Sequence, residues 1–167
     1  MIKQLVIASG LTFGLTGYAE AITTLQFAAK FEQRRSIDID PTGPSLGDEF
    51  PGSGLLVDSK KNTIGTFNVI SFITRINANS VNRWVEAQYA FGSGSDSINI
   101  EGDQEFEFTG FPEKNYTEHF AISGGTGKYA GARGECVVAL VNDTDYVVVC
   151  KFNSIKLTFP DPSTIKW

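Results

Sequence analysis

The sequence predicts an all-β fold, either a sandwich or a barrel, because short strand-like runs recur between regularly spaced turns. The runs are rich in Val, Ile, Phe and Tyr, and the turns contain Gly, Asn, Asp and Pro. No amphipathic pattern longer than two helical turns stands between them. A chain of 167 residues also fits a single domain.

The expected strands follow one another along most of the chain. The first alternates Leu25, Phe27, Ala29 and Phe31, which is typical of a strand with one buried face. The expected strands span residues 23–31, 53–58, 63–76, 83–91, 96–102, 104–110, 116–123, 135–141 and 145–159. The acidic–aromatic alternation of 104–110 is most simply an edge strand with an acidic outer face.

Several expected strands are apolar at both alternating positions, as in NVISFI (68–73) and CVVALV (136–141). A sheet that is covered on both faces explains this pattern. One face would border a filled or ligand-holding interior, and the other would border a partner subunit. The final segment, FPDPSTIKW (159–167), contains two prolines and is expected to run extended over the surface.

The N-terminal segment 1–21 has the features of a secretory signal peptide. A single early lysine, Lys3, precedes an apolar run, and AEA at 19–21 is a small–x–small cleavage pattern. A membrane anchor is the alternative, but the run is shorter than the ~20 residues that a spanning helix needs. We therefore expect a secreted, extracellular protein that is cleaved after Ala21.

In an oxidising compartment, Cys136 and Cys150 are candidates for a disulfide. They flank two valine-rich runs joined by a polar turn at 142–145, which predicts a hairpin that brings them almost opposite each other. Two buried thiols are the alternative, because directly opposed strand positions do not always suit disulfide geometry. Asn115 and Asn142 begin N-x-S/T sequons and are candidate glycosylation sites in a eukaryotic host.

The charge balance argues against nucleic acid as a partner. The formal net charge is −5, and removal of the signal segment leaves it unchanged because Lys3 and Glu20 are lost together. Nucleic-acid-binding domains normally carry a basic patch or a high isoelectric point. The single histidine and the two separated cysteines also lack the ligand spacing of the usual zinc sites, so no metal site is expected.

The glycine-rich stretch SGGTGKYAGARGE (123–135) resembles a phosphate-binding loop at first sight. A P-loop is excluded because Tyr129 follows Lys128, where a Ser or Thr is required. The dinucleotide fingerprint fails as well, since its third glycine, Gly131, comes one residue late and no βαβ context surrounds it. We therefore expect no nucleotide and no cofactor, and instead glycines that shape a corner between two strands.

Within AISGGTGKYAGARGE (121–135), the same stretch resembles the signature of the allene oxide cyclase and dirigent protein superfamily. SLGDEFPGSGLLVDSKKNTIG (45–65) and VEAQYAFGSGSDSINIEG (85–102) are similar to that superfamily's upstream segments, in the same order. The resemblance runs from about Leu25 to Leu157. It implies a calycin-like, eight-stranded antiparallel β-barrel with an apolar pocket, assembled as a homotrimer or homodimer.

The resemblance implies a domain plan and a pocket. The plan is a signal peptide at 1–21, a barrel domain at 22–160 and a C-terminal tail at 161–167. The implied ligand pocket is lined by Phe27, Ala29, Phe31, Phe67, Val69 and Ile73. In the cyclases the first strand carries a glutamate, but here that position falls on Ala29. Glu32 is near, yet it would face the other side unless a bulge intervenes.

Three residues are candidates for catalysis by the same resemblance. The position of a cyclase cysteine falls on Ser71, Arg133 matches an arginine of dirigent proteins, and a dirigent acidic position falls on His119. Arg133 and His119 could together orient a carbonyl or phenol and move a proton. The alternative is that His119 is a surface or structural residue and that Arg133 pairs with Glu135 or Asp143. Glu86 is either an external strand charge or an interior acid.

Two functions follow as expectations. The first is a cofactor-free cyclase, isomerase or stereo-directing protein that holds a small apolar organic ligand in one geometry. The missing first-strand carboxylate makes true allene oxide cyclase activity unexpected. The second is a non-enzymatic secreted barrel that binds a lipid-like ligand or acts at a cell surface.

Overall fold

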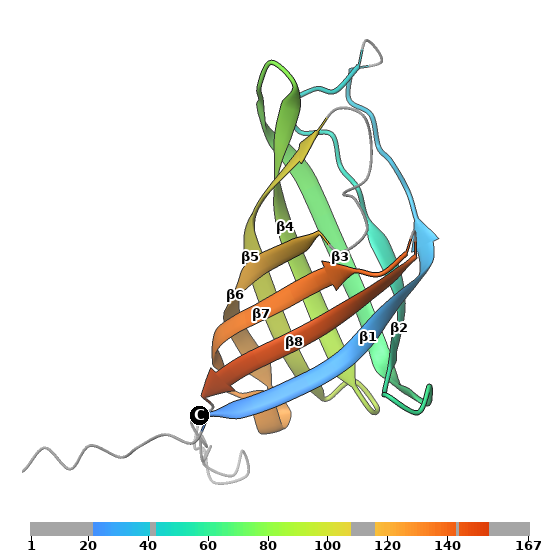
Figure 1. Ribbon diagram of the computed structural model, residues 1–167, viewed down its shortest axis with the longest axis vertical. Helices are drawn as coiled ribbons and strands as arrows, with labels where there is room; N and C mark the ends of the chain where they lie inside the picture. The colour runs from blue at the N-terminus through green and yellow to red at the C-terminus, as the bar shows by residue number, and fades with distance from the viewer. Residues whose placement is uncertain (1–21, 41–42, 108–115, 143, 154–167) are drawn as a thin grey trace, which may run out of the picture.

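The computed structural model describes residues 22–40, 43–107, 116–142 and 144–153, which form a closed barrel of eight antiparallel strands (Figure 1). Each strand pairs with the next along the chain, and β8 pairs with β1 to close the barrel. The strands are β1 (Thr23–Arg34), β2 (Gly52–Val57), β3 (Thr63–Ile76), β4 (Ser80–Phe91), β5 (Asp96–Glu107), β6 (Thr117–Thr126), β7 (Arg133–Leu140) and β8 (Asp145–Asn153). The expected eight-stranded antiparallel barrel is confirmed.

Strand β5 differs from the expectation, because it joins two segments that were expected to be separate strands. Gly102 lies in its middle, and the ring of Phe120 on β6 occupies the space that a side chain at Gly102 would take. The described part of the edge expected at 104–110, residues 104–107, pairs with β4 alone, because the pairing of β5 with β6 ends at Glu101. Within its described part, Phe106 faces the interior and Glu105 is exposed, so the alternation separates inside from outside.

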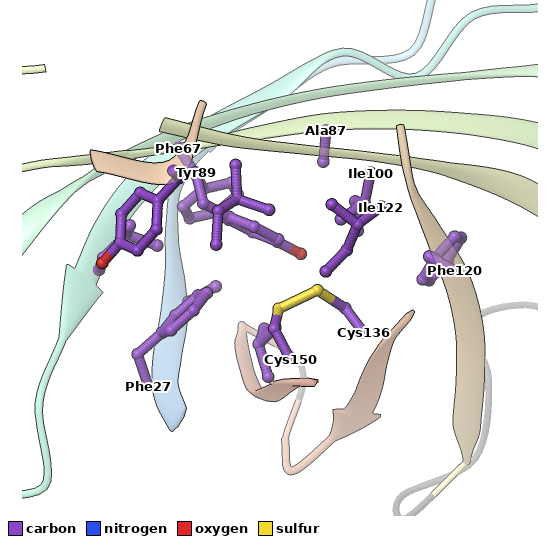
Figure 2. Close-up of a cluster of buried hydrophobic side chains, with 14 of the residues drawn as sticks. Phe27, Phe67, Ala87, Tyr89, Ile100, Phe120, Ile122, Cys136 and Cys150 are labelled. Atoms are coloured by element: carbon purple, nitrogen blue, oxygen red, sulfur yellow. A yellow bond between two sulfur atoms is a disulfide. The ribbon is translucent and has the colours of Figure 1, made fainter. Parts of the chain in front are cut away.

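The core fills one end of the barrel, where large inward-facing side chains pack together (Figure 2). The ring of Phe27 meets the rings of Tyr89 and Phe91 edge-on, with centroid distances of 5.0 and 5.4 Å. Cys136 and Cys150 are directly opposed on β7 and β8 and form a buried disulfide in this core. Of the two states expected for the cysteines, the structure therefore contains the disulfide.

The glycine-rich stretch closes this packed end. A short 3-10 helix (Gly127–Tyr129) joins β6 to β7. Gly127 has a φ of +57°, and a side chain there would collide with Asp96. The Asp96 carboxylate accepts a hydrogen bond from the backbone N–H of Lys128 and pairs with its Nζ at 3.1 Å. Lys128 thus anchors a turn, and the expected corner between two strands is confirmed.

Apolar side chains also face outward on β7 and β8. Val137 and Val149 are paired in register and are half-buried, and they alternate with the inward-facing Cys136 and Cys150. This explains why the two strands read as apolar at both alternating positions. The partner subunit expected on this outer face stays a prediction.

Gly134 should tolerate substitution much less well than a glycine in a free turn. An alanine Cβ at Gly134 would collide with the carbonyl of Lys151 on β8, whereas Gly94, also at positive φ, has no atom within 4 Å. We expect Gly134→Ala to lower the free energy of unfolding by about 2–3 kcal/mol and Gly94→Ala by about 1 kcal/mol. Urea unfolding of both variants measures the difference, and equal losses would contradict the close β7–β8 approach.

Candidate functional site

A cavity of about 710 Å³ lies on the side of the core away from Phe27 and the disulfide, and core residues such as Phe67 and Ala87 form part of its wall. Its walls come from β1, from β3 to β8, and from the described part of the 35–51 segment that joins β1 to β2. Binding pockets for small organic molecules typically measure roughly 300–1,000 Å³. The cavity therefore has the size for one ligand of that class.

Small inward-facing side chains leave the space open. Ala29, Ser71 and Ala87 face the interior at this level, whereas larger rings fill the interior at the core end. Aromatic rings form much of the remaining wall, and those of Phe31 and Phe67 meet edge-on at a centroid distance of 4.9 Å. A ligand in this space would lie against mostly apolar surface.

Arg83 on β4 brings a positive charge to this apolar space. Its guanidinium carbon lies 3.7 Å from the ring centroid of Phe50 and 4.5 Å from that of Phe106. Burial lowers the pKa of Arg83, and the negative charge of Asp48 opposes the change, as does that of Tyr146 once its phenol is ionised. An arginine stays protonated at neutral pH even after such a shift. The site therefore contains a fixed cation between two aromatic rings.

A β-bulge brings a second arginine to the cavity. The pairing of β1 with β2 shifts register between Phe31 and Gln33. The extra residue reverses the alternation, so Arg34 lines the cavity although it lies three positions after the inward-facing Phe31. The Arg34 guanidinium carbon lies 3.9 Å from the ring centroid of Phe31 and 5.8 Å from that of Tyr146. Glu32 itself is exposed.

Two tyrosines supply neutral hydroxyl groups to the lining. Burial raises the pKa of Tyr146, and the charges of Arg34 and Arg83 partly oppose this rise. Burial also raises the pKa of Tyr89 far above its usual value. Both phenols are therefore protonated near pH 7, when each can donate one hydrogen bond.

Asp48 holds the 35–51 segment beside the mouth of the cavity. Its carboxylate accepts hydrogen bonds from the backbone N–H of Ile39 at 3.0 Å, from the backbone N–H of Ser45 at 2.9 Å, and from the Ser45 hydroxyl. The hydrogen bond from the Ser45 hydroxyl is the largest of the causes that lower the pKa of Asp48 below 3.8. Phe50 joins the same segment to β3 by backbone hydrogen bonds with Ser71.

Most of the expected pocket residues do line the cavity. They are Ala29, Phe31, Phe67, Val69 and Ile73, and Ser71 lines it too. Phe27 does not, because it lies one inward position deeper and packs into the core. The catalytic role of Ser71 stays a prediction.

His119 and Arg133 lie outside the lining of the cavity, and their role in catalysis stays a prediction. His119 is on the outer face of β6, where its Nδ1 lies 2.7 Å from Oε1 of Glu135 and both side chains are mostly exposed. Arg133 is exposed at the packed end and donates to the backbone carbonyl of Ala132. Glu86 is likewise exposed.

Of the two candidate glycosylation sites, the structure describes Asn142 alone. Asn142 is exposed, and its side-chain oxygen accepts hydrogen bonds from Thr144 and Asp145 in the β7–β8 turn. Asn115 lies outside the described residues, as do the expected signal peptide (1–21) and the tail (161–167). Glycosylation at either sequon stays a prediction.

Of the polar residues that line the cavity, the sequence pointed only to Ser71; Arg34, Arg83 and Tyr146 are among those it did not indicate. Arg83 alternates with Val85, Ala87 and Tyr89 on the inward face of β4, so this alternation could have predicted its place.

Within the described ranges, no group of three or more His, Cys, Asp or Glu residues could hold a metal ion, and no helix is long and apolar enough to cross a membrane.

Comparison with protein-family models and with curated proteins gives no match. Among solved structures, the chain is similar to a pyocyanin demethylase, with 23% identity over 78% of this chain and 100% of that one, and a TM-score of 0.66. It is also similar to AbnU, an exo-specific intermolecular Diels-Alderase, with 13% identity, coverage of 79% and 98%, and a TM-score of 0.60. A third similar structure is the Diels-Alderase AbmU from Streptomyces koyangensis. It has 15% identity over 89% of this chain and 76% of that one, with a TM-score of 0.63.

These likenesses show the fold. Known small-molecule enzymes, cyclases among them, are built on a barrel of the same kind. The three neighbours are named as a demethylase and two Diels-Alderases, so membership of the allene oxide cyclase and dirigent superfamily stays a prediction.

We expect Asp48→Asn to loosen the 35–51 segment, because an asparagine NH₂ group replaces an oxygen that accepts a hydrogen bond. Hydrogen exchange at the Ile39 and Ser45 amides should become faster. Asp58→Asn is the matched control, since Asp58 holds the β2–β3 turn through equivalent bonds from Lys60 and Asn62. Because the folded pKa of Asp48 lies below 3.8, its ionised form holds the segment above that pH and is lost as the pH falls further. Asp58→Asn should leave exchange at the Ile39 and Ser45 amides unchanged. Unchanged exchange at these amides in Asp48→Asn would refute the role of Asp48.

Proposed function

We propose that the protein is a secreted barrel that binds a small, largely apolar metabolite and directs its cyclisation, isomerisation or coupling without a cofactor. The observation that carries this proposal is the cavity of about 710 Å³, which has mostly apolar walls and a few fixed polar groups. Walls of this kind hold a flexible ligand in one geometry. Positioning alone can lower a reaction barrier by ~7–11 kcal/mol in favourable systems.

The polar groups of the lining give the cavity a chemical role beyond positioning. Arg83 is a fixed cation, and the protonated phenols of Tyr89 and Tyr146 are hydrogen-bond donors. A donor placed on a carbonyl oxygen of a conjugated ligand withdraws electron density from the reacting carbons. It also stabilises negative charge that develops on that oxygen in the transition state. Both effects accelerate cycloaddition and enolisation.

The names of the structural neighbours guide the choice of test compounds. Two are Diels-Alderases and one is a demethylase of pyocyanin. Conjugated dienes with carbonyl dienophiles, and pyocyanin itself, are therefore the first compounds to test. Native mass spectrometry of protein purified from its host should precede them, because a ligand that copurifies would define the class directly.

Filling the cavity should abolish binding and turnover. We expect Ala87→Trp to do so, since Ala87 lines the cavity, while Ala121→Trp should not, because Ala121 is exposed on the outside of β6. The readout is the stereoisomer ratio of the product on a chiral column. The unaltered protein and Ala121→Trp should give one stereoisomer in excess, and Ala87→Trp should give the ratio of the uncatalysed reaction.

Other results of the same experiment would change the proposal. A compound that binds the unaltered protein, fails to bind Ala87→Trp and is released unchanged would make the barrel a carrier, the second of the expected functions. If no compound of the panel distinguishes the unaltered protein from Ala87→Trp, the cavity is not the binding site and the proposal is wrong.

Secretion makes a separate prediction. Protein purified from its own host should begin at Ile22, because the signal segment is cut after Ala21. Intact-mass measurement together with N-terminal sequencing checks this. A mature protein that keeps Met1 would exclude signal cleavage and would leave the argument for the cavity unchanged.

A further inference from the structure

Arg83 is placed as a recognition group rather than as a member of an ion pair. It faces the cavity between Ile73 on β3 and Gln104 on β5, its partners in register, so it has no charged neighbour across either strand. Among the described residues, the ion pairs within 4.0 Å do not include it. Its Nε is buried and has no hydrogen-bond partner in the described part of the chain.

The contacts of Arg83 with aromatic rings hold its guanidinium in the cavity wall. The guanidinium carbon lies over the rings of Phe50 and Phe106, 3.7 and 4.5 Å from their centroids. The N–H donors of a guanidinium radiate in its own plane. A carboxylate or a similar oxyanion binds arginine along the edge of this plane, where two N–H groups can donate to it side by side.

The acidic groups near the cavity do not take this place. Asp48 influences the charge of Arg83, but its oxygens already accept three hydrogen bonds from Ile39 and Ser45. Asp38 and Glu107 also line the cavity and are exposed. A second guanidinium, that of Arg34, lies on the same side, beside Tyr146. The buried side of the cavity therefore presents donors.

From these contacts we propose that the natural ligand is a planar conjugated molecule that carries an anionic oxygen, a carboxylate, enolate or phenolate, and that Arg83 binds this oxygen edge-on. Phe31, Phe67 and Phe120 supply apolar surface for the conjugated body. This inference rests on the proposed function, because it names the chemistry of the ligand for the same cavity. A buried donor without a partner is costly, and an oxyanion on the ligand supplies the missing acceptor.

The test uses two fluorescent probes that differ only in charge. 1-Anilinonaphthalene-8-sulfonate carries an anionic group, and N-phenyl-1-naphthylamine has the same rings without it. We expect Arg83→Met to weaken binding of the anionic probe about 10- to 100-fold and that of the neutral probe less than about 3-fold. Arg83→Lys should fall between, because it keeps the charge without the planar fork. Arg75→Met is the matched control, since Arg75 is exposed and outside the lining, and it should change neither affinity.

A measurement on the unaltered protein keeps the test decisive if Arg83→Met does not fold. There 2-naphthoate should displace the neutral probe at a concentration at least about 10-fold lower than 2-naphthamide does. Equal displacement, or equal losses for both probes in Arg83→Met, would overturn the anion proposal and leave the small-molecule cavity standing. If neither probe distinguishes the unaltered protein from Ala87→Trp, the cavity binds no conjugated ligand, and the proposed function falls as well.

Discussion

The pairing of β1 with β8 is the constraint on which the rest of the structure depends. It joins the two ends of the described chain in an antiparallel register that runs from Thr23 with Phe152 to Lys30 with Asp145. Without this seam the strands would form an open sheet, and its inner face would be exposed to water. Closure turns alternate residues into an interior, and it brings Tyr146 next to Ala29 in the wall of the cavity.

The interior is divided by the size of the side chains. At the packed end, Phe27, Phe91 and Phe152 meet around the disulfide and exclude a ligand. At the open end, alanine, serine and valine occupy the equivalent inward positions, and the space they leave becomes the cavity. The same alternation of inward and outward residues thus gives one sheet both a packed core and a cavity. The cavity lining carries Arg34, Arg83 and Tyr146, which can orient a ligand against the apolar walls.

The sequence was sufficient for the fold because inside and outside alternate along nearly every strand, and the turns between strands are marked by glycine, asparagine and aspartate. The site was only partly predictable, because alternation identifies a face without giving its depth in the barrel. Phe27 and Ala29 share a face and both belong to the core, yet only Ala29 also lines the cavity. Depth depends on how the neighbouring strands tilt, which a single strand does not reveal.

The positions of Arg34 and His119 could not be taken from the sequence directly, and each has a physical reason. The bulge that turns Arg34 inward depends on pairing with β2, so the β1 sequence alone does not reveal it. His119 was assigned by resemblance to the interior, although Phe120 and Ile122 are the apolar residues of β6 and both are buried. Burial of apolar side chains was the stronger indicator there, and it places His119 on the outer face.

A chamber that is filled at one end imposes an order on whatever enters it. The packed side chains around Phe27 and the disulfide close the interior beyond Tyr89, so a molecule at that level enters and leaves on the side of Arg83. For a reaction between two molecules, the one that sits deeper has to arrive first, and the one nearer the mouth blocks its exit. For such a reaction, this geometry favours ordered over random binding. The deeper molecule can leave only after the outer one has left.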